Sequence, residues 1–142
     1  MTLRDVETGD LDHFFEQQSD PEASALAGVP MRDRASFDLR WSEIVNDRTI
    51  VIRTIEADGE IAGYVFSFQF EGELRIGYWL GRGFWGRGIA SGAVAEFLER
   101  ETRRPLFATV HPDNAASIRI LEKNGFETTE ADAVAGLRYI LR

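Results

Sequence analysis

The 142 residues of the chain include no cysteine, which excludes disulfides, a thiolate nucleophile and any cysteine-based metal site. Only two histidines are present, His13 and His111, and they stand far apart in the sequence. Because a dedicated metal site needs several such ligands close together, the sequence predicts that the protein uses no metal.

Long hydrophobic runs are also missing, since no apolar segment approaches the roughly 18 residues that a membrane span needs. The first residues, MTLRDVETGD, are acidic and lack the apolar core of a secretion signal. We therefore expect a cytoplasmic protein that has no membrane partner.

Positive charge is scarce, with 16 lysines and arginines against 24 acidic residues and a net charge of -8. Non-specific binding of nucleic acid needs a basic surface, so this balance argues against a nucleic-acid partner. An acidic balance is compatible with a cationic substrate.

The chain contains no repeat, low-complexity tract or linker, and its length suits a single domain over residues 1–142. Hydrophobic periodicity predicts a strand, two helices, three strands, a helix, a strand, a helix and two final strands. Asp10 is the expected N-cap of the first helix, and Asp58-Gly59 the turn of a β-hairpin. Prolines and a glycine punctuate residues 19–30, which are expected to form a short helix and a loop. This order describes a mixed α/β sheet with a central strand–helix–strand crossover.

The last third of the chain carries clear boundary signals. Asn114 is the expected N-cap of the last helix, and Asn124-Gly125 its stop. Residues 126–131 and 136–142 are expected to form the two closing strands.

Five glycines fall within residues 81–93, GRGFWGRGIASGA, directly before an expected helix. Glycine serves where the backbone turns unusually or where a ligand approaches it closely. The first amides of a helix are unpaired and its dipole is positive there, so this loop suits an anion.

Two common phosphate-binding patterns match this loop only in part. Gly81, Gly83 and Gly86 fit G-x-G-x-x-G, but the next strand ends without the acidic residue that a dinucleotide ribose needs. A Walker loop would need a lysine and a hydroxyl residue where Arg87 and Gly88 stand. Neither a dinucleotide site nor a magnesium–nucleotide site is therefore favoured.

The segment WGRGIA, from Trp85 to Ala90, resembles motif A of the GNAT superfamily of acyl-CoA-dependent N-acetyltransferases, written Q/R-x-x-G-x-G/A. Gly88 and Ala90 match its small positions, whereas Trp85 stands where glutamine or arginine is usual. The longer string IGYWLGRGFWGRGIA is similar to the RimJ/RimL branch, which is related to ribosomal-protein N-terminal acetyltransferases. Downstream, HPDNAASIRILEKNGFE is similar to motif B. The resemblance covers most of residues 4–126 and implies a GNAT-like, mostly antiparallel central sheet with a strand–helix–strand CoA-binding core.

The resemblance also implies acetyl-CoA as co-substrate, with its pyrophosphate on successive amides of the glycine loop. It implies that the strand over residues 76–80 pairs with the pantetheine arm where it diverges from the strand over residues 106–110. Arg82 and Arg87 either contact the phosphates or lie in solvent, and Asn114 either contacts the donor or serves only as an N-cap. The expected donor-binding residues are Tyr78, Trp79, Leu80, Arg82, Trp85, Gly86, Arg87, Gly88, Ile89, Ala90, Ser91 and Asn114.

Acetyl transfer to an amine needs a neutral amine, an oxyanion donor and a proton for the departing thiolate. The resemblance implies a backbone amide at residues 78–80 as the oxyanion donor, a carboxylate near Glu73, and a role for Ser117 as the motif B serine. His111 ends a strand beside the expected cleft, and imidazole is the side chain that titrates near neutrality. The candidate catalytic residues are Glu73, His111 and Ser117, which also have structural interpretations as turn, loop and helix-face residues. Arg75 occupies a position that is often acidic in relatives, so the general base stays open.

The pKa values of amines indicate which kind of amine accepts the acetyl group. A lysine amine has a pKa of about 10.4 and an α-amine one of about 7.7–8.0, so neutralising the α-amine costs roughly 3.4 kcal/mol less. The sequence therefore predicts acetyl transfer to a peptide or protein N-terminus, an amino acid or another small amine, by a monomer or a homodimer. A non-catalytic acyl-CoA sensor is the alternative function, because motif A predicts binding and not turnover.

Overall fold

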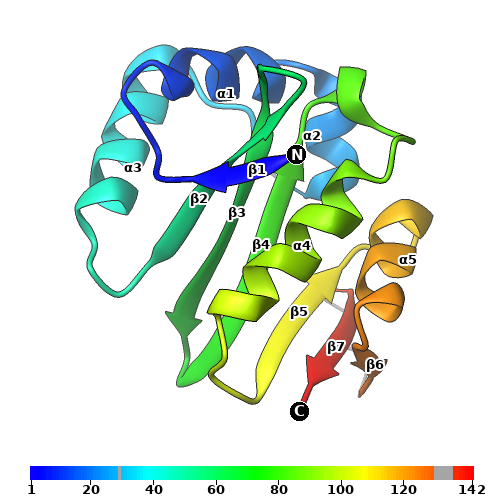
Figure 1. The fold of residues 1–142 in the computed structure, drawn as a ribbon. Helices are drawn as coiled ribbons and strands as arrows, with labels where there is room; N and C mark the ends of the chain where they lie inside the picture. Colours follow the sequence, from blue (N-terminus) through cyan, green and yellow to red (C-terminus); the bar gives the residue numbers. More distant parts are fainter. Residues whose placement is uncertain (29, 130–135) are drawn as a thin grey trace.

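Seven strands form one sheet in the order β1-β2-β3-β4-β5-β7-β6 in the computed structural model, which describes residues 1–28, 30–129 and 136–142 (Figure 1). Helices cover both faces of this sheet. Helices α4 (Ile89–Arg100) and α5 (Ala115–Lys123) pack on one face, and α1 (Asp10–Gln18) and α3 (Arg34–Asn46) pack on the other. The predicted mixed α/β architecture, mostly antiparallel, is confirmed.

Two tight two-residue turns join three consecutive strands in the sheet's first half. Strand β2 (Val51–Ala57) is paired on one side with β1 (Thr2–Arg4) and on the other with β3 (Glu60–Phe70). The predicted turn at Asp58-Gly59 is confirmed, and Glu71-Gly72 joins β3 to β4 (Glu73–Leu80) in the same way. All four turn residues have positive φ, the conformation that matches the twist of flanking strands.

The central crossover runs from β4 through the short 3₁₀ turn η1 (Arg82–Phe84) and α4 to the parallel strand β5 (Leu106–Val110). These two strands are paired at one position, where Arg75 lies opposite Phe107. Beyond that pair they diverge, which leaves the later part of β4 without a strand on its β5 side. The expected divergence of the two strands is therefore present.

The chain ends beside β5. Asn114 caps α5 by accepting a hydrogen bond from the Ser117 amide, as expected, and Gly125 follows the helix with φ of 91°. Strand β6 comprises only Glu127–Thr128, and the rest of the predicted strand over 126–131 is loop or lies outside the described residues. Strand β7 (Leu137–Leu141) lies between β5 and β6.

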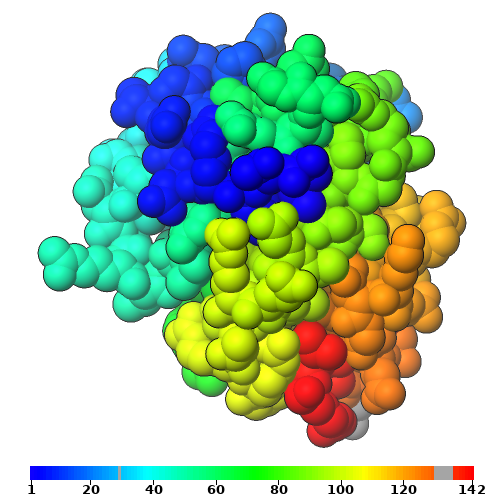
Figure 2. Space-filling model, viewed as in Figure 1, coloured from blue at the N-terminus to red at the C-terminus, as the bar shows by residue number. Residues whose placement is uncertain are grey.

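Two hydrophobic clusters hold the layers together. The larger packs α4 and α5 against the sheet, with Phe97, Leu106 and Leu121 almost fully buried. The smaller packs α1 and α3 on the opposite face through the aromatic rings of Phe14 and Trp41. On the first face, β1 lies against α4, and the two cover neighbouring parts of the surface (Figure 2).

Asp10 is not the N-cap that the sequence predicted. The helix begins at Asp10, after Gly9, and the Asp10 side chain turns inward instead of capping the first turn. Its two carboxylate oxygens each accept a 2.8 Å hydrogen bond from Arg4, and Oδ2 also accepts from the Glu7 amide and the Thr54 hydroxyl. Burial raises the pKa of Asp10, but these hydrogen bonds outweigh it and lower the pKa below its usual value. The network ties β1, α1 and β2 together.

Replacing Asp10 with alanine is expected to lower the free energy of unfolding by about 3 kcal/mol, because Arg4 would lose its buried partner. Because the Asp10 pKa is lowered on folding, its stabilisation is present above about pH 4 and is lost as the pH falls through the lowered value. Urea unfolding at several pH values measures both effects. Asp38→Ala, which removes an exposed ion pair with Arg34, is the control and should change stability little. Equal stabilities of the two variants would contradict the assignment.

Candidate active site

A cavity of about 640 Å³ opens where β4 and β5 diverge. Strands β3, β4 and β5 line it, together with the glycine loop, the first turn of α4, one face of α5 and helix α2 (Pro21–Ala27). On the side of β4 that faces β5, the backbone of residues 77–80 has no strand partner, because the pairing of the two strands ends at Arg75. The cavity therefore has an extended backbone edge along its length.

The glycine loop forms an open concavity at one end of the cavity. Gly86 and Gly88 both have φ of 74°, and a methyl group added to either would meet nothing within 4 Å. Gly88 is the N-cap of α4, and no side chain caps the helix there. The first amides of α4 are thus available to an anion, as the sequence predicted.

Trp85 fastens the loop to the end of β4. Its indole nitrogen donates a 2.8 Å hydrogen bond to the Leu80 carbonyl, and its ring lines the cavity. The residue that departs from the usual motif A pattern therefore holds the loop against the strand that precedes it.

Neither arginine of the loop lines the cavity. Arg82 binds Asp20 and Glu22 at the start of α2 through ion pairs of 2.6 and 2.8 Å, and Arg87 is paired with Asp58 in the β2–β3 turn. The sequence left two positions open for these arginines, contact with the phosphates or a solvated loop, and in the structure local carboxylates hold both guanidinium groups.

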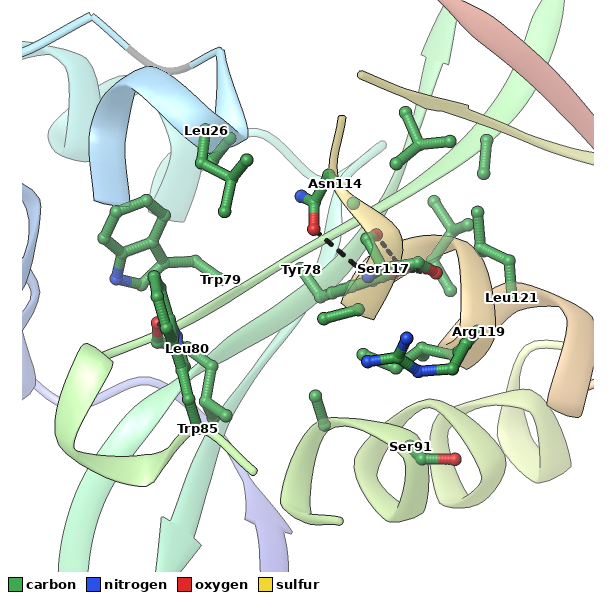
Figure 3. A pocket seen from close by; sticks show the side chains of 18 of the residues that line it. Leu26, Tyr78, Trp79, Leu80, Trp85, Ser91, Asn114, Ser117, Arg119 and Leu121 are labelled. Carbon is green, nitrogen blue, oxygen red and sulfur yellow. Dashed lines mark hydrogen bonds between the residues drawn. The ribbon is translucent and has the colours of Figure 1, made fainter. Parts of the chain in front are cut away.

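Two other cations line the cavity from α5. Arg119 and Lys123 lie one turn apart on α5 and both line the cavity. In Figure 3, Arg119 extends from α5 into the cavity opposite the first turn of α4, which carries Ser91. Sequence reasoning missed both residues, although their i, i+4 spacing places them on one face of the helix.

Ser117 and Tyr78 meet across the cavity. The Tyr78 hydroxyl lies 2.6 Å from Ser117 Oγ, and Asn114 accepts from the Ser117 amide at 3.1 Å (Figure 3). Burial raises the pKa of Tyr78 to about 12, despite the hydrogen bond with Ser117, which lowers it. Tyr78 was expected to bind the donor through its backbone, and its hydroxyl adds a polar group that the sequence did not reveal.

The other two catalytic candidates are placed differently. His111 lies on the rim of the cavity, half exposed, and its Nδ1 accepts a hydrogen bond from the Asp113 amide at 3.1 Å. Glu73 does not line the cavity, and its Oε2 accepts a 2.6 Å hydrogen bond from Arg138. The structure brings His111 and Ser117 to the cavity and leaves Glu73 in an ion pair beside it.

Trp79 points to the other face of the sheet from Tyr78, because side chains alternate along a strand. In Figure 3 it lies with Leu26 of α2, across the cavity from Ser117. The expected contact of Trp79 with the donor is through its backbone, and its side chain lies at the other end of the cavity. The cavity thus has one end at α4 and α5 and a second end between α2 and the aromatic face of β3 and β4.

The lining carries positive charge in an otherwise acidic protein. Its charged residues are Arg75, Arg119 and Lys123, and no aspartate or glutamate lies among the described residues that line the cavity. In the described ranges, no three potential ligands gather to hold a metal ion, and no helix has the length and apolarity to cross a membrane.

Comparison with known proteins identifies the family. Residues 1–127 match the model of the acetyltransferase (GNAT) domain, so the chain belongs to this family. An uncharacterised N-acetyltransferase p20 of Bacillus licheniformis is 29% identical over 140 residues, which cover 89% of this chain and 79% of that protein. The fold is similar to RimJ of Mycobacterium smegmatis (TM-score 0.80, 22% identity, 98% and 80% of the two chains). It is also similar to RimL, a ribosomal L7/L12 α-N-protein acetyltransferase (TM-score 0.83, 17% identity, 98% and 92%).

Family membership makes the chain an acetyltransferase with acetyl-CoA as co-substrate. The residues of the cavity fit this donor. The glycine loop leaves a concavity that side chains would fill, the first amides of α4 are uncapped, and α5 adds two cations to the cavity lining, all of which suit an anionic donor.

Gly88→Val is expected to weaken acetyl-CoA binding at least about tenfold, because the side chain would occupy the concavity at the helix N-terminus. The positive φ of Gly88 also strains any L side chain, by about 1–2 kcal/mol. Gly72→Val is the matched control, since Gly72 has φ of 77° and similar open space in the β3–β4 turn, away from the cavity. Calorimetry that finds wild-type affinity in a folded Gly88→Val variant would refute the concavity as the donor site.

Proposed function

We propose that the protein transfers the acetyl group of acetyl-CoA directly to an α-amine or another primary amine of low pKa. The observation that carries this proposal is one continuous cavity, with an anion-binding loop at one end and an aromatic wall at the other. Its two ends meet at the diverging strands β4 and β5, where the reacting groups would be held together.

In this proposal the donor lies along the free edge of β4. The pantetheine arm pairs with the backbone of residues 77–80, and the pyrophosphate binds the amides that begin α4. Arg119 and Lys123 balance the phosphate charge from α5. The uncapped helix start and the unpaired strand edge support this placement.

The amine loses its proton to solvent before it reacts. No carboxylate lies among the described lining residues, and Arg138 already holds Glu73. Without a strong base, an α-amine reacts more readily than a lysine side chain, because its neutral form costs roughly 3.4 kcal/mol less at pH 7. The similarity of the fold to RimL, whose name describes an α-N-protein acetyltransferase, is consistent with this preference.

The reaction balances without a covalent enzyme intermediate. The neutral amine attacks the thioester carbonyl, a backbone amide within residues 78–80 stabilises the oxyanion, and the carbon–sulfur bond then breaks. The nitrogen, cationic after its attack, releases one proton to solvent and so becomes the amide nitrogen. The departing thiolate accepts a hydrogen bond from the Tyr78–Ser117 pair and takes up one proton from solvent to give free CoA. Because its pKa is about 12, Tyr78 keeps its proton at neutral pH and acts here as a hydrogen-bond donor.

Release of CoA from acetyl-CoA with a panel of primary amines tests the function. We expect turnover whose pH dependence follows the pKa of each amine, because the amine itself must be neutral. Glu73→Gln and His111→Asn should each lower kcat less than about tenfold, well below the 10²–10⁴ expected for loss of a general base.

Two outcomes would contradict this proposal. A thousandfold loss in either variant, with acetyl-CoA affinity unchanged, would identify a protein base. Tight binding of acetyl-CoA without release of CoA by any amine would favour the alternative function as a non-catalytic acyl-CoA sensor.

Tyr78→Phe and Ser117→Ala test the thiolate partner. Each should lower kcat about tenfold to a hundredfold, the effect of one hydrogen bond to a charged group, and leave the affinity for acetyl-CoA nearly unchanged. Tyr78→Phe should remove no ionisation below about pH 10, since the Tyr78 pKa lies near 12. Ser42→Ala, on an exposed part of α3, is the matched control for Ser117→Ala. Wild-type kcat in both cavity variants would exclude the pair from the reaction.

A further inference from the structure

We propose that the acceptor amine also carries a carboxylate, as a free amino acid does, and that Arg75 binds this carboxylate. This inference rests on the proposed function and concerns the second end of the same cavity. It follows from two hydrogen-bond donors on β4 that lack partners and from the charge and shape of the surface around them.

Arg75 is the first of these donors. It lines the cavity, its side chain is 21% exposed, and its buried Nε has no hydrogen-bond partner. The nearest carboxylate oxygen, on Glu73, lies 4.0 Å from Nε, and Arg138 holds that oxygen at 2.6 Å. An arginine whose buried Nε lacks a partner inside a cavity is suited to an anion that arrives with the substrate, because a buried donor without a partner is costly.

Trp79 supplies the second unmet donor. It is 5% exposed, lines the cavity, and its buried indole nitrogen has no hydrogen-bond partner. Arg75 and Trp79 are four positions apart on β4 and therefore project from the same face. At about 3.3 Å per residue their backbone positions lie about 13 Å apart, so a single carboxylate meets only one of the two donors. Arg75, which carries the positive charge, is the donor that suits a carboxylate.

The surface between these donors is apolar. Phe66 and Phe68 of β3 stack with ring centroids 5.2 Å apart, and Leu26 faces the cavity from α2. The guanidinium of Arg75 lies 4.8 Å from the centre of the Phe70 ring, so aromatic surface adjoins the charge. A ligand that combines a carboxylate with an apolar side chain matches this arrangement.

The same surface disfavours a polycation. Binding of several ammonium groups needs carboxylates, whereas the charged groups that line the described part of the cavity are all positive. A free amino acid with a large apolar side chain brings the amine, the carboxylate and the apolar group in one small molecule.

The experiment compares L-phenylalanine with L-phenylalaninamide at saturating acetyl-CoA, with spermidine as the polycationic probe. A neighbouring carboxylate raises the pKa of an amine, so amine reactivity alone would favour the amide. We expect kcat/KM to favour L-phenylalanine over its amide by about tenfold or more, mainly through a lower KM, with spermidine the poorest acceptor.

Arg75→Gln removes the charge and should lower the ratio of the two kcat/KM values about tenfold to a hundredfold. Arg75→Lys keeps the charge without the planar fork and should give an intermediate ratio. Arg53→Gln, which removes a half-buried arginine of β2 outside the cavity, is the matched control and should keep the wild-type ratio. Unchanged affinity for acetyl-CoA shows that each variant is folded.

The outcomes separate the two proposals. If no amine releases CoA, the proposed function fails. If amines react but the amide, spermidine or a peptide N-terminus is the better acceptor, or if Arg75→Gln leaves the ratio unchanged, the carboxylate proposal alone is wrong.

Discussion

The loss of pairing between β4 and β5 is the constraint on which the rest of the site depends. A parallel pair that continued past Arg75 and Phe107 would fill the cavity with strand and satisfy the backbone edge internally. Because the pairing ends early, the protein keeps an extended backbone edge inside the cavity. Helices α2 and α5 flank this edge from its two sides. The glycine loop then follows directly at the end of β4, so one strand supplies both the edge and the approach to the α4 N-terminus.

The contrast between surface and cavity is the second organising feature. The chain has a net charge of -8, yet the charged residues that line the described part of the cavity are two arginines and a lysine. Acidic side chains outside the cavity form ion pairs with other arginines. Asp10 pairs with Arg4, and Asp58 in the β2–β3 turn pairs with Arg87. Overall charge therefore says little about the acceptor, and the initial link between an acidic chain and a cationic substrate does not extend to the cavity.

Much of the fold could be predicted because its signals are local. Turn chemistry defines the hairpin at Asp58-Gly59, and the Asn114 cap marks the start of α5. Features that depend on distant partners could not be predicted. Asp10 has the residue type of an N-cap, but Arg4 and Thr54 draw its carboxylate inward.

The same distinction holds for the candidate site. The glycines that shape the anion-binding loop are visible in the sequence, since their backbone conformation is a local property. The partners of side chains are not visible, because tertiary contacts decide whether an arginine is free. Arg82 and Arg87 are near the loop in sequence but paired elsewhere, whereas Arg75 stands beside Glu73 and is left without a close partner.

The contact of Arg82 with the start of α2 joins the two ends of the cavity mechanically. Arg82 lies two residues after the end of β4 and forms an ion pair with Asp20. The Asp20 side chain also caps α2, the helix that carries Leu26. Arg82 and Glu22 are exposed and Asp20 is partly exposed, so dissolved salt weakens these ion pairs more than it weakens the apolar packing beneath the sheet. Ionic strength therefore acts on the link between α2 and the glycine loop, two segments that line opposite ends of the cavity.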